Sequence, residues 1–154
     1  MDTILLAFHS IFRWLVLAIM SYAIYRAYRG WLTARPFSPF DNRIRHLTAT
    51  IIQVQLLIGL WLYFASNTVS YFLHHFHEAI HNKEMRFFGM EHSLLMLIAV
   101  IIVSIGSASA KRKPTDREKF RTMAIWFTIG FLIILIYIPW AFSPMASRPW
   151  FRPF

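Results

Sequence analysis

The side chains best suited to chemistry stand inside long apolar stretches of the sequence. His9 and Arg13 occur in the first stretch, and Glu91 and His92 occur in the third. Ionisable side chains are costly to place in hydrocarbon, so the few that occur there usually face a protein interior and serve a function. We therefore expect these four residues to form the functional site.

His9 and His92 have the placement that a b-type haem with two histidine ligands needs. His9 lies about six residues into its apolar stretch and His92 about five, which at ~1.5 Å per residue puts both roughly 8 to 9 Å below one membrane boundary. Imidazoles at equal depth on parallel helices can bind one iron from opposite sides, while apolar side chains enclose the macrocycle. Hydroxyls of Ser10 or Ser93 could orient the rings. The alternative is that both histidines are ordinary polar residues near the interface.

Arg13 and Glu91 are the further candidates for cofactor binding. Arg13 lies one helical turn after His9 on the same face, where it suits a haem propionate or a quinone carbonyl. Glu91 directly precedes His92 and points roughly 100° away from it, so it could take up protons from the outer side. The alternative for Arg13 and Glu91 is a structural ion pair with each other.

The segment between the second and third apolar stretches is rich in histidine and reads YFLHHFHEAIHNKEMR. Three of its histidines recur at helical spacing: His74, His77 and His81. This spacing predicts an amphipathic helix on the outer membrane surface. HEAIH also matches a short zinc motif in which Glu78 would be the general base, but Phe87 stands where the extended motif needs a third histidine. Copper or zinc binding is the alternative use of these histidines.

Four apolar stretches must position these residues, at about 4–28, 47–72, 87–109 and 123–142, each near the ~20 residues that a membrane helix needs. We expect one all-α domain over residues 1–154, an integral membrane four-helix bundle with up-down-up-down topology. Pro36 and Pro39 should keep the first connection non-helical. Thr115 is a suitable N-cap for the last helix, which Pro139 should end or kink.

Basic residues predict the orientation of this bundle. The net charge is +9. The first and third connections, with their flanks, carry most of the basic side chains: Arg26, Arg29, Arg35, Arg43, Arg45, Lys111, Arg112, Lys113, Arg117, Lys119 and Arg121. Positive charge concentrates in cytoplasmic connections, so the histidine-rich segment and both termini should be periplasmic in a bacterial inner membrane, N-out/C-out. This placement argues against nucleic acid as a partner. The lack of cysteine excludes disulfides, thiolate metal sites and covalent attachment of a c-type haem.

The second stretch contributes polar residues without charge. Gln53 and Gln55 are expected in the inner half of its helix, where they should join helices by hydrogen bonds, with quinone binding as the alternative. His46 stands at the cytoplasmic start of the second helix, and no second histidine occurs at that depth. A second haem with two histidine ligands is therefore not expected, and the sequence predicts one haem.

Four segments together carry a family resemblance: HSIFRWLVL, IIQVQLLIGLWLYF, MRFFGMEHSLLMLIAVIIVSIG and IPWAF. In their order and spacing the chain resembles a group of small bacterial four-helix membrane proteins that are described as cytochrome b-like, over nearly its whole length. The resemblance implies that His9 and His92 are the haem ligands, and it carries the family's Arg, Trp and Glu onto Arg13, Trp14 and Glu91. The HHFHEAIH stretch is not part of the family pattern, which counts against a metalloprotease.

The sequence thus predicts a membrane b-type cytochrome with one haem near the outer face. It would exchange electrons with the quinone pool or serve as a subunit of a respiratory complex. Two alternatives stay open: a copper- or zinc-binding or transport protein that uses the histidine-rich segment, and a cofactor-free structural subunit of a membrane complex.

Overall fold

In the computed structural model, which describes residues 3–150, every regular element is a helix. Four long helices are α1 (Thr3–Thr33), α2 (Pro39–Ala65), α6 (His92–Arg112) and α7 (Asp116–Tyr137). Short elements connect α2 to α6: α3 (Asn67–His74), α4 (Phe76–Ala79), α5 (Lys83–Arg86) and the π-helix η1 (Phe87–Glu91). Each of the four expected stretches supplies most of its residues to one long helix, but only 4–28 lies wholly within one.

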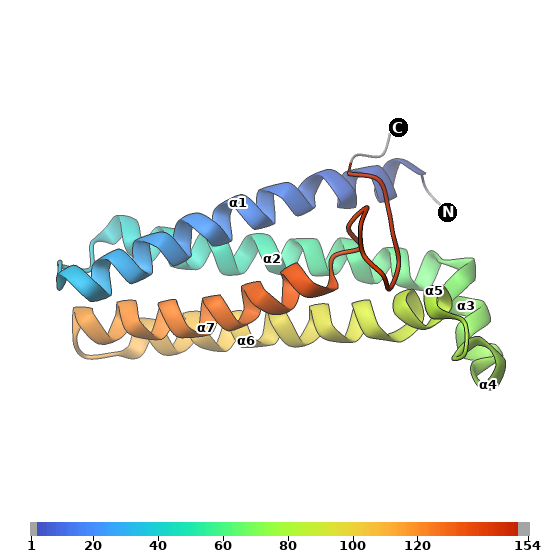
Figure 1. Cartoon of the computed structure of the whole chain (residues 1–154). Helices are drawn as coiled ribbons and strands as arrows, with labels where there is room; N and C mark the ends of the chain where they lie inside the picture. Colours follow the sequence, from blue (N-terminus) through green and yellow to red (C-terminus); the bar gives the residue numbers. More distant parts are fainter. Residues whose placement is uncertain (1–2, 151–154) are drawn as a thin grey trace.

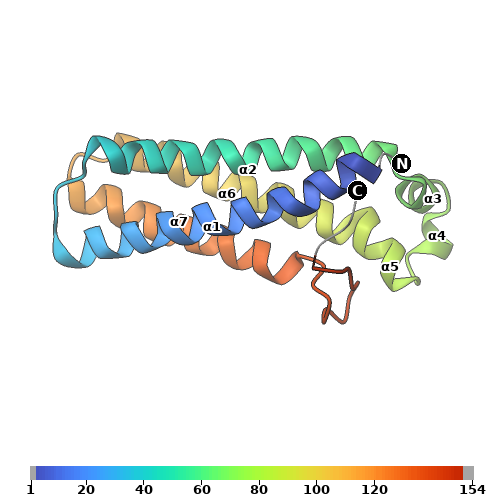
Figure 2. The same ribbon diagram turned by 90° about the horizontal axis from the view of Figure 1, so that it is seen from above.

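The long helices form a four-membered ring. Helix α1 packs on α2, α2 on α6, α6 on α7, and α7 on α1, which leaves α1 and α6 diagonally opposed (Figures 1 and 2). Residues 34–38 and 113–115 connect the helices at one end, which we call the loop end. The opposite end holds α3–α5, the start of α1 and the tail after α7, and we call it the terminal end (Figure 1).

Side-chain caps fix where the helices begin at the loop end. Ser38 caps α2 by accepting from the backbone N–H of Asp41, whose carboxylate in turn accepts from the Ser38 N–H. The expected non-helical role of Pro39 is wrong, because Pro39 is the first residue of α2, a position where no N–H is needed. Thr115 caps α7 with Glu118 in the same reciprocal arrangement, as the sequence predicted for Thr115.

The expected second helix over 47–72 is interrupted. Helix α2 ends at Ala65, and Ser66 both closes it through its N–H to Tyr63 O and begins α3 by accepting from Val69 N. The Ser66 hydroxyl satisfies an N–H that would otherwise lack a partner at the start of a helix. Because α2 starts at Pro39 and ends before Phe72, its residues sit nearer the terminal end than the sequence suggested.

Small residues allow the long helices to approach closely. Gly106 on α6 lies directly beneath the Trp126 side chain of α7, so a Cβ at this position would overlap the indole. Ala99 and Ala110 on α6 and Ala124 on α7 are fully buried in the same seam. Close contact between helices through small residues is typical of packing within membranes.

Most of the apolar surface points outward. Only 22% to 33% of the most apolar window of each long helix is buried within the protein. Large side chains such as Leu57, Trp61 and Ile136 are more than half exposed. Such a surface would be unfavourable in water, so the four helices, each long and apolar enough to cross a bilayer, fit a multi-pass membrane protein.

Candidate functional site

His9 and His92 approach each other at the terminal end of the bundle. His9 is on α1 and His92 is the first residue of the diagonally opposed α6, and the two rings are close enough to interact electrostatically. Arg13 is within the same range of both rings. Three of the four residues that the sequence singled out thus converge on one region between the helices.

His9 packs against α2. Its backbone carbonyl accepts a hydrogen bond of 3.0 Å from Gln55 Nε2, and the same amide nitrogen lies 3.4 Å from His9 Nε2. A Cβ on Gly59 would stand 3.1 Å from His9 Cε1, so the bare backbone of Gly59 makes room for the ring. The remaining ring nitrogen, His9 Nδ1, is buried and has no hydrogen-bond partner among the described residues.

His92 is held by the end of α7. Its Nδ1 lies 2.8 Å from the carbonyl oxygen of Tyr137, the last residue of that helix. A carbonyl in the last turn of a helix has no partner within the helix and can accept from a side chain. Pro139 accounts for the helix end, because it cannot donate to Leu135 O, to which the Trp140 indole donates instead at 2.8 Å.

A π-helical turn sets the direction of His92. The His92 N–H donates to Phe87 O, five residues back, at the junction of η1 and α6. Such turns rotate the following side chains relative to a regular helix and occur often at functional sites. The Phe87 and Phe88 rings flank His92, with centroids 5.6 Å and 6.3 Å from the imidazole centroid.

Arg13 is bound by the C-terminal tail. Its Nη2 donates to Trp150 O at 2.9 Å, and its guanidinium lies over the rings of Trp14 and Trp140. The indoles of Trp14, Trp140 and Trp150 contact one another. The tail therefore folds back against α1 (Figure 1), and its Trp150 joins Trp14 and Trp140 in one aromatic cluster.

Glu91 forms its ion pair with Arg86, at 2.7 Å, rather than with the expected partner Arg13. The π-helix turns Glu91 toward the start of its own segment, where Arg86 lies five residues earlier. Ser93 also differs from expectation: its hydroxyl donates to Met90 O, and the orienting group of His92 is the Tyr137 carbonyl. Glu91 therefore stands outside the contacts that hold the two rings.

Each of the two histidine rings is held by a protein group at one nitrogen. Gln55 contacts His9 Nε2, and the Tyr137 carbonyl contacts His92 Nδ1. His9 Nδ1 has no hydrogen-bond partner among the described residues, but it lies on the edge of the ring that faces Gly59 of α2, so metal binding through Nδ1 would require the ring to turn toward α6. Fixing one imidazole nitrogen by a hydrogen bond is how proteins orient metal-binding histidines.

The histidine-rich segment is broken into short turns. The expected amphipathic helix is wrong: α3 ends at His74, α4 covers only Phe76–Ala79, and His81 lies in the following turn. HEAIH therefore does not lie on one helix face. Within residues 3–150, no three His, Cys, Asp or Glu side chains gather into a group that could hold a metal ion. The segment thus offers no preassembled three-ligand site among these residues.

Glu78, the expected general base of that motif, instead accepts a hydrogen bond from Tyr71. The Tyr71 hydroxyl donates to Glu78 Oε2 at 3.2 Å. This hydrogen bond, together with the nearby negative charge, raises the pKa of Tyr71 above its ordinary value. The contact ties α4 to α3 on the exposed side of the segment.

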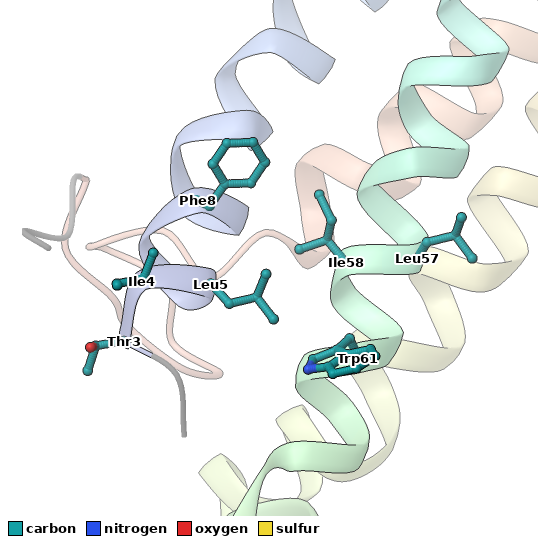
Figure 3. Close-up of a pocket in the computed structure, with 7 residues that line it drawn as sticks. All are labelled: Thr3, Ile4, Leu5, Phe8, Leu57, Ile58 and Trp61. Carbon is teal, nitrogen blue, oxygen red and sulfur yellow. The ribbon is translucent and has the colours of Figure 1, made fainter.

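An open apolar groove lies between α1 and α2 at the terminal end (Figure 3). Its volume is about 790 Å³, and Leu5 and Phe8 line one side while Ile58 and Trp61 line the other. Phe8 precedes His9 in α1. The groove thus opens on the outer, apolar side of the α1–α2 pair. The contact between His9 and Gln55 lies on the inner side of the same two helices.

Sequence reasoning misplaced one group of this site, Gln55, and missed another, the Tyr137 carbonyl. Gln55 was expected in the inner half of its helix, but it is level with His9 because α2 starts earlier than expected. Pro139 could have indicated the role of the Tyr137 carbonyl. A proline ends a helix, and the carbonyls of the last turn are then left to accept hydrogen bonds from side chains. Gln53, in contrast, joins helices as expected, by a 3.0 Å hydrogen bond to Ser104 Oγ.

No protein-family model, curated protein or solved structure compared with the chain matches it.

Proposed function

We propose that this protein is a membrane b-type cytochrome that carries one haem between His9 and His92. The four helices would cross a bacterial inner membrane in up-down-up-down order, with the basic loop end in the cytoplasm and both termini in the periplasm. The haem would then lie near the periplasmic face. The protein would transfer electrons alone or as a subunit of a respiratory complex.

One observation carries this proposal. His9 and His92, on diagonally opposed helices, lie within electrostatic range of each other, and each ring has one nitrogen in contact with a protein group. Purely structural histidines would be expected to use both nitrogens, because a buried polar atom without a partner is unfavourable. His9 Nδ1 is such an atom.

The chain's own residues would divide the work of a redox site. A bound haem would supply a one-electron redox couple. Gln55 and the Tyr137 carbonyl would hold the two imidazoles in place, and Phe87 and Phe88 would exclude water on the His92 side. Arg13 provides positive charge within electrostatic range of both rings, which suits a propionate.

The apolar groove supports the quinone pool as the electron partner. Its volume of about 790 Å³ falls within the usual range for ligand sites, roughly 300 to 1,000 Å³. It opens between two helices that are apolar enough to face hydrocarbon, where quinones dissolve. Phe8 precedes His9 in α1 and points about 100° away from it, so a quinone in the groove would lie at the level of the proposed haem on another face of the same helix.

The proposal is tested by expressing the full chain with ample haem and recording its reduced-minus-oxidised visible spectrum. We expect sharp low-spin b-type bands from the wild-type protein and their loss in His9→Ala and in His92→Ala. His46→Ala and His81→Ala are the matched controls, because these histidines lie away from the site and their replacement should leave the bands intact.

A flat spectrum from well-folded wild-type protein would contradict the proposal. Retention of full haem binding in both His9→Ala and His92→Ala would contradict the ligand assignment. Co-purification with a complex, together with tolerance of His9→Ala and no haem, would favour the cofactor-free structural subunit.

A further inference from the structure

The loop end carries more positive charge than its acids neutralise. Its one fully buried acid, Asp41, pairs with Arg26 and Arg35, each at 2.7 Å. Arg45 is also buried and donates to Ser107 O and Oγ. These cations therefore serve the fold. Other Lys and Arg side chains at this end are exposed, and none forms an ion pair with a described residue: Arg29, Arg43, Lys111, Arg112, Lys113, Arg117 and Arg121.

Most of these exposed cations gather where α6 passes into α7. We call Lys111, Arg112, Lys113, Arg117 and Arg121 the basic corner. Two acids lie nearby: Asp116 pairs with Lys119, and Glu118, which caps α7 through Thr115, also attracts Lys113 and Arg121, so these acids offset only part of the positive charge. Arg121 also lies over the ring of Trp31, an aromatic residue of the kind found at the membrane interface. The basic corner is thus a compact positive surface at the ends of two membrane-crossing helices.

Within residues 3–150, the arginines at the terminal end are paired instead. Arg86 pairs with Glu91, Arg148 with Glu84, and Arg13 donates to the Trp150 carbonyl. This leaves Lys83 as an exposed cation for which the described residues provide no ion pair. The surplus charge of the basic corner is therefore a local property of one end and not a general excess of basic residues.

We propose that the basic corner binds the headgroups of anionic phospholipids. Anionic headgroups at a membrane surface supply the negative charge that the protein does not, and clusters of four to eight Lys or Arg at the end of a membrane helix typically bind them. Helices α6 and α7 place these side chains at the level where headgroups lie if the helices cross the bilayer. The proposal does not depend on a haem.

Native mass spectrometry of the full chain in detergent tests this proposal. Phosphatidylglycerol and phosphatidylcholine with identical acyl chains are offered together, and the ratio of the two bound lipids is measured. We expect the wild-type protein to prefer phosphatidylglycerol. Each neutralised cation should reduce the preference roughly fivefold at low ionic strength. Replacing all five residues of the basic corner by Gln should therefore remove it.

Two control variants separate charge and place from other effects. Changing Arg112, Arg117 and Arg121 to Lys keeps the charge and should keep the preference. Lys83→Gln removes an exposed charge at the terminal end and should leave the preference unchanged. Thermal unfolding of each variant shows whether it is folded as the wild type is.

Three results would overturn the proposal. The wild type could show no preference for phosphatidylglycerol, which would leave an acidic protein surface as the partner class. The five-residue Gln variant could keep the preference while folded. Millimolar inorganic phosphate could displace the lipid, which would identify a general anion site rather than a lipid surface.

Discussion

The two ends of the bundle satisfy their polar groups to different degrees. At the loop end, Asp41 is 1% exposed and accepts from Arg26, Arg35 and the N–H and hydroxyl of Ser38. At the terminal end, His9 Nδ1 and Gln55 Oε1 are buried without a hydrogen-bond partner among the described residues, whereas Arg35 Nε is the one such atom at the loop end. Proteins tend to leave polar groups unsatisfied where function requires them. The difference is in line with our proposal that the terminal end binds a ligand, while the loop end chiefly stabilises the fold.

The largest expected effect on folding comes from removing the Asp41 carboxylate. Asp41→Asn leaves two arginines without their acid, and breaking a buried pair in this way costs about 3 kcal/mol. Thermal unfolding in detergent measures the loss. Asp116→Asn is the matched control, because its pair with Lys119 is exposed and should contribute under about 1 kcal/mol. Equal losses in the two variants would contradict the central role of Asp41.

A change at Gly59 tests the terminal end. Gly59→Val would press on the His9 ring, since even a Cβ would stand 3.1 Å from Cε1. We expect a loss of about 1 to 3 kcal/mol in stability and a large fall in haem occupancy. Leu57→Val, on the exposed side of the same helix, should change neither quantity. Normal haem occupancy in Gly59→Val would show that the His9 ring does not need this space.

Gln55 and Gln53 form a matched pair on α2. Each donates one inter-helix hydrogen bond of 3.0 Å, Gln55 to His9 O and Gln53 to Ser104 Oγ. Replacing either residue by Leu should cost about 0.6 kcal/mol, a typical value for such bonds in membranes. Only Gln55→Leu should also shift the haem midpoint potential, because only Gln55 contacts His9. Identical potentials in the two variants would remove Gln55 from the site.

The smallest expected effect is on the titration of Tyr71. Its pKa is raised by the hydrogen bond to Glu78, so Glu78→Gln should move its deprotonation to lower pH in an ultraviolet titration. The pKa of Tyr71 is higher in the folded protein than its ordinary value. The stabilisation from this hydrogen bond is therefore fully present below the ordinary pKa and is lost as the pH rises through the folded-state pKa. A Tyr71→Phe background identifies the signal. An unchanged titration would mean that the contact does not form.

The sequence predicted the four long helices and drew attention to the ionisable residues of the candidate site because both depend on composition. Four long apolar stretches dictate four long helices, and His9 and His92 stand out because charge and polarity are rare around them. Their convergence follows from equal depth on helices that run the same way. The helices and the depth of the two histidines can be predicted without knowing any individual side-chain contact.

The remaining features depend on contacts that the sequence pattern does not encode. The π-helix turns Glu91 toward Arg86, and an ordinary helical projection cannot anticipate that rotation. The Ser38 cap moves the start of α2 and so shifts Gln55 to the level of His9. The histidine spacing predicted one surface helix, but the chain turns at His75 and again after Ala79.

Low-temperature electron paramagnetic resonance of the oxidised, haem-loaded protein tests the central claim most directly. Two imidazoles on one iron give a low-spin ferric signal, so we predict a single low-spin species that disappears in both His9→Ala and His92→Ala. A purely high-spin signal from the wild type would contradict the claim, because it would mean that His9 and His92 do not bind one iron together.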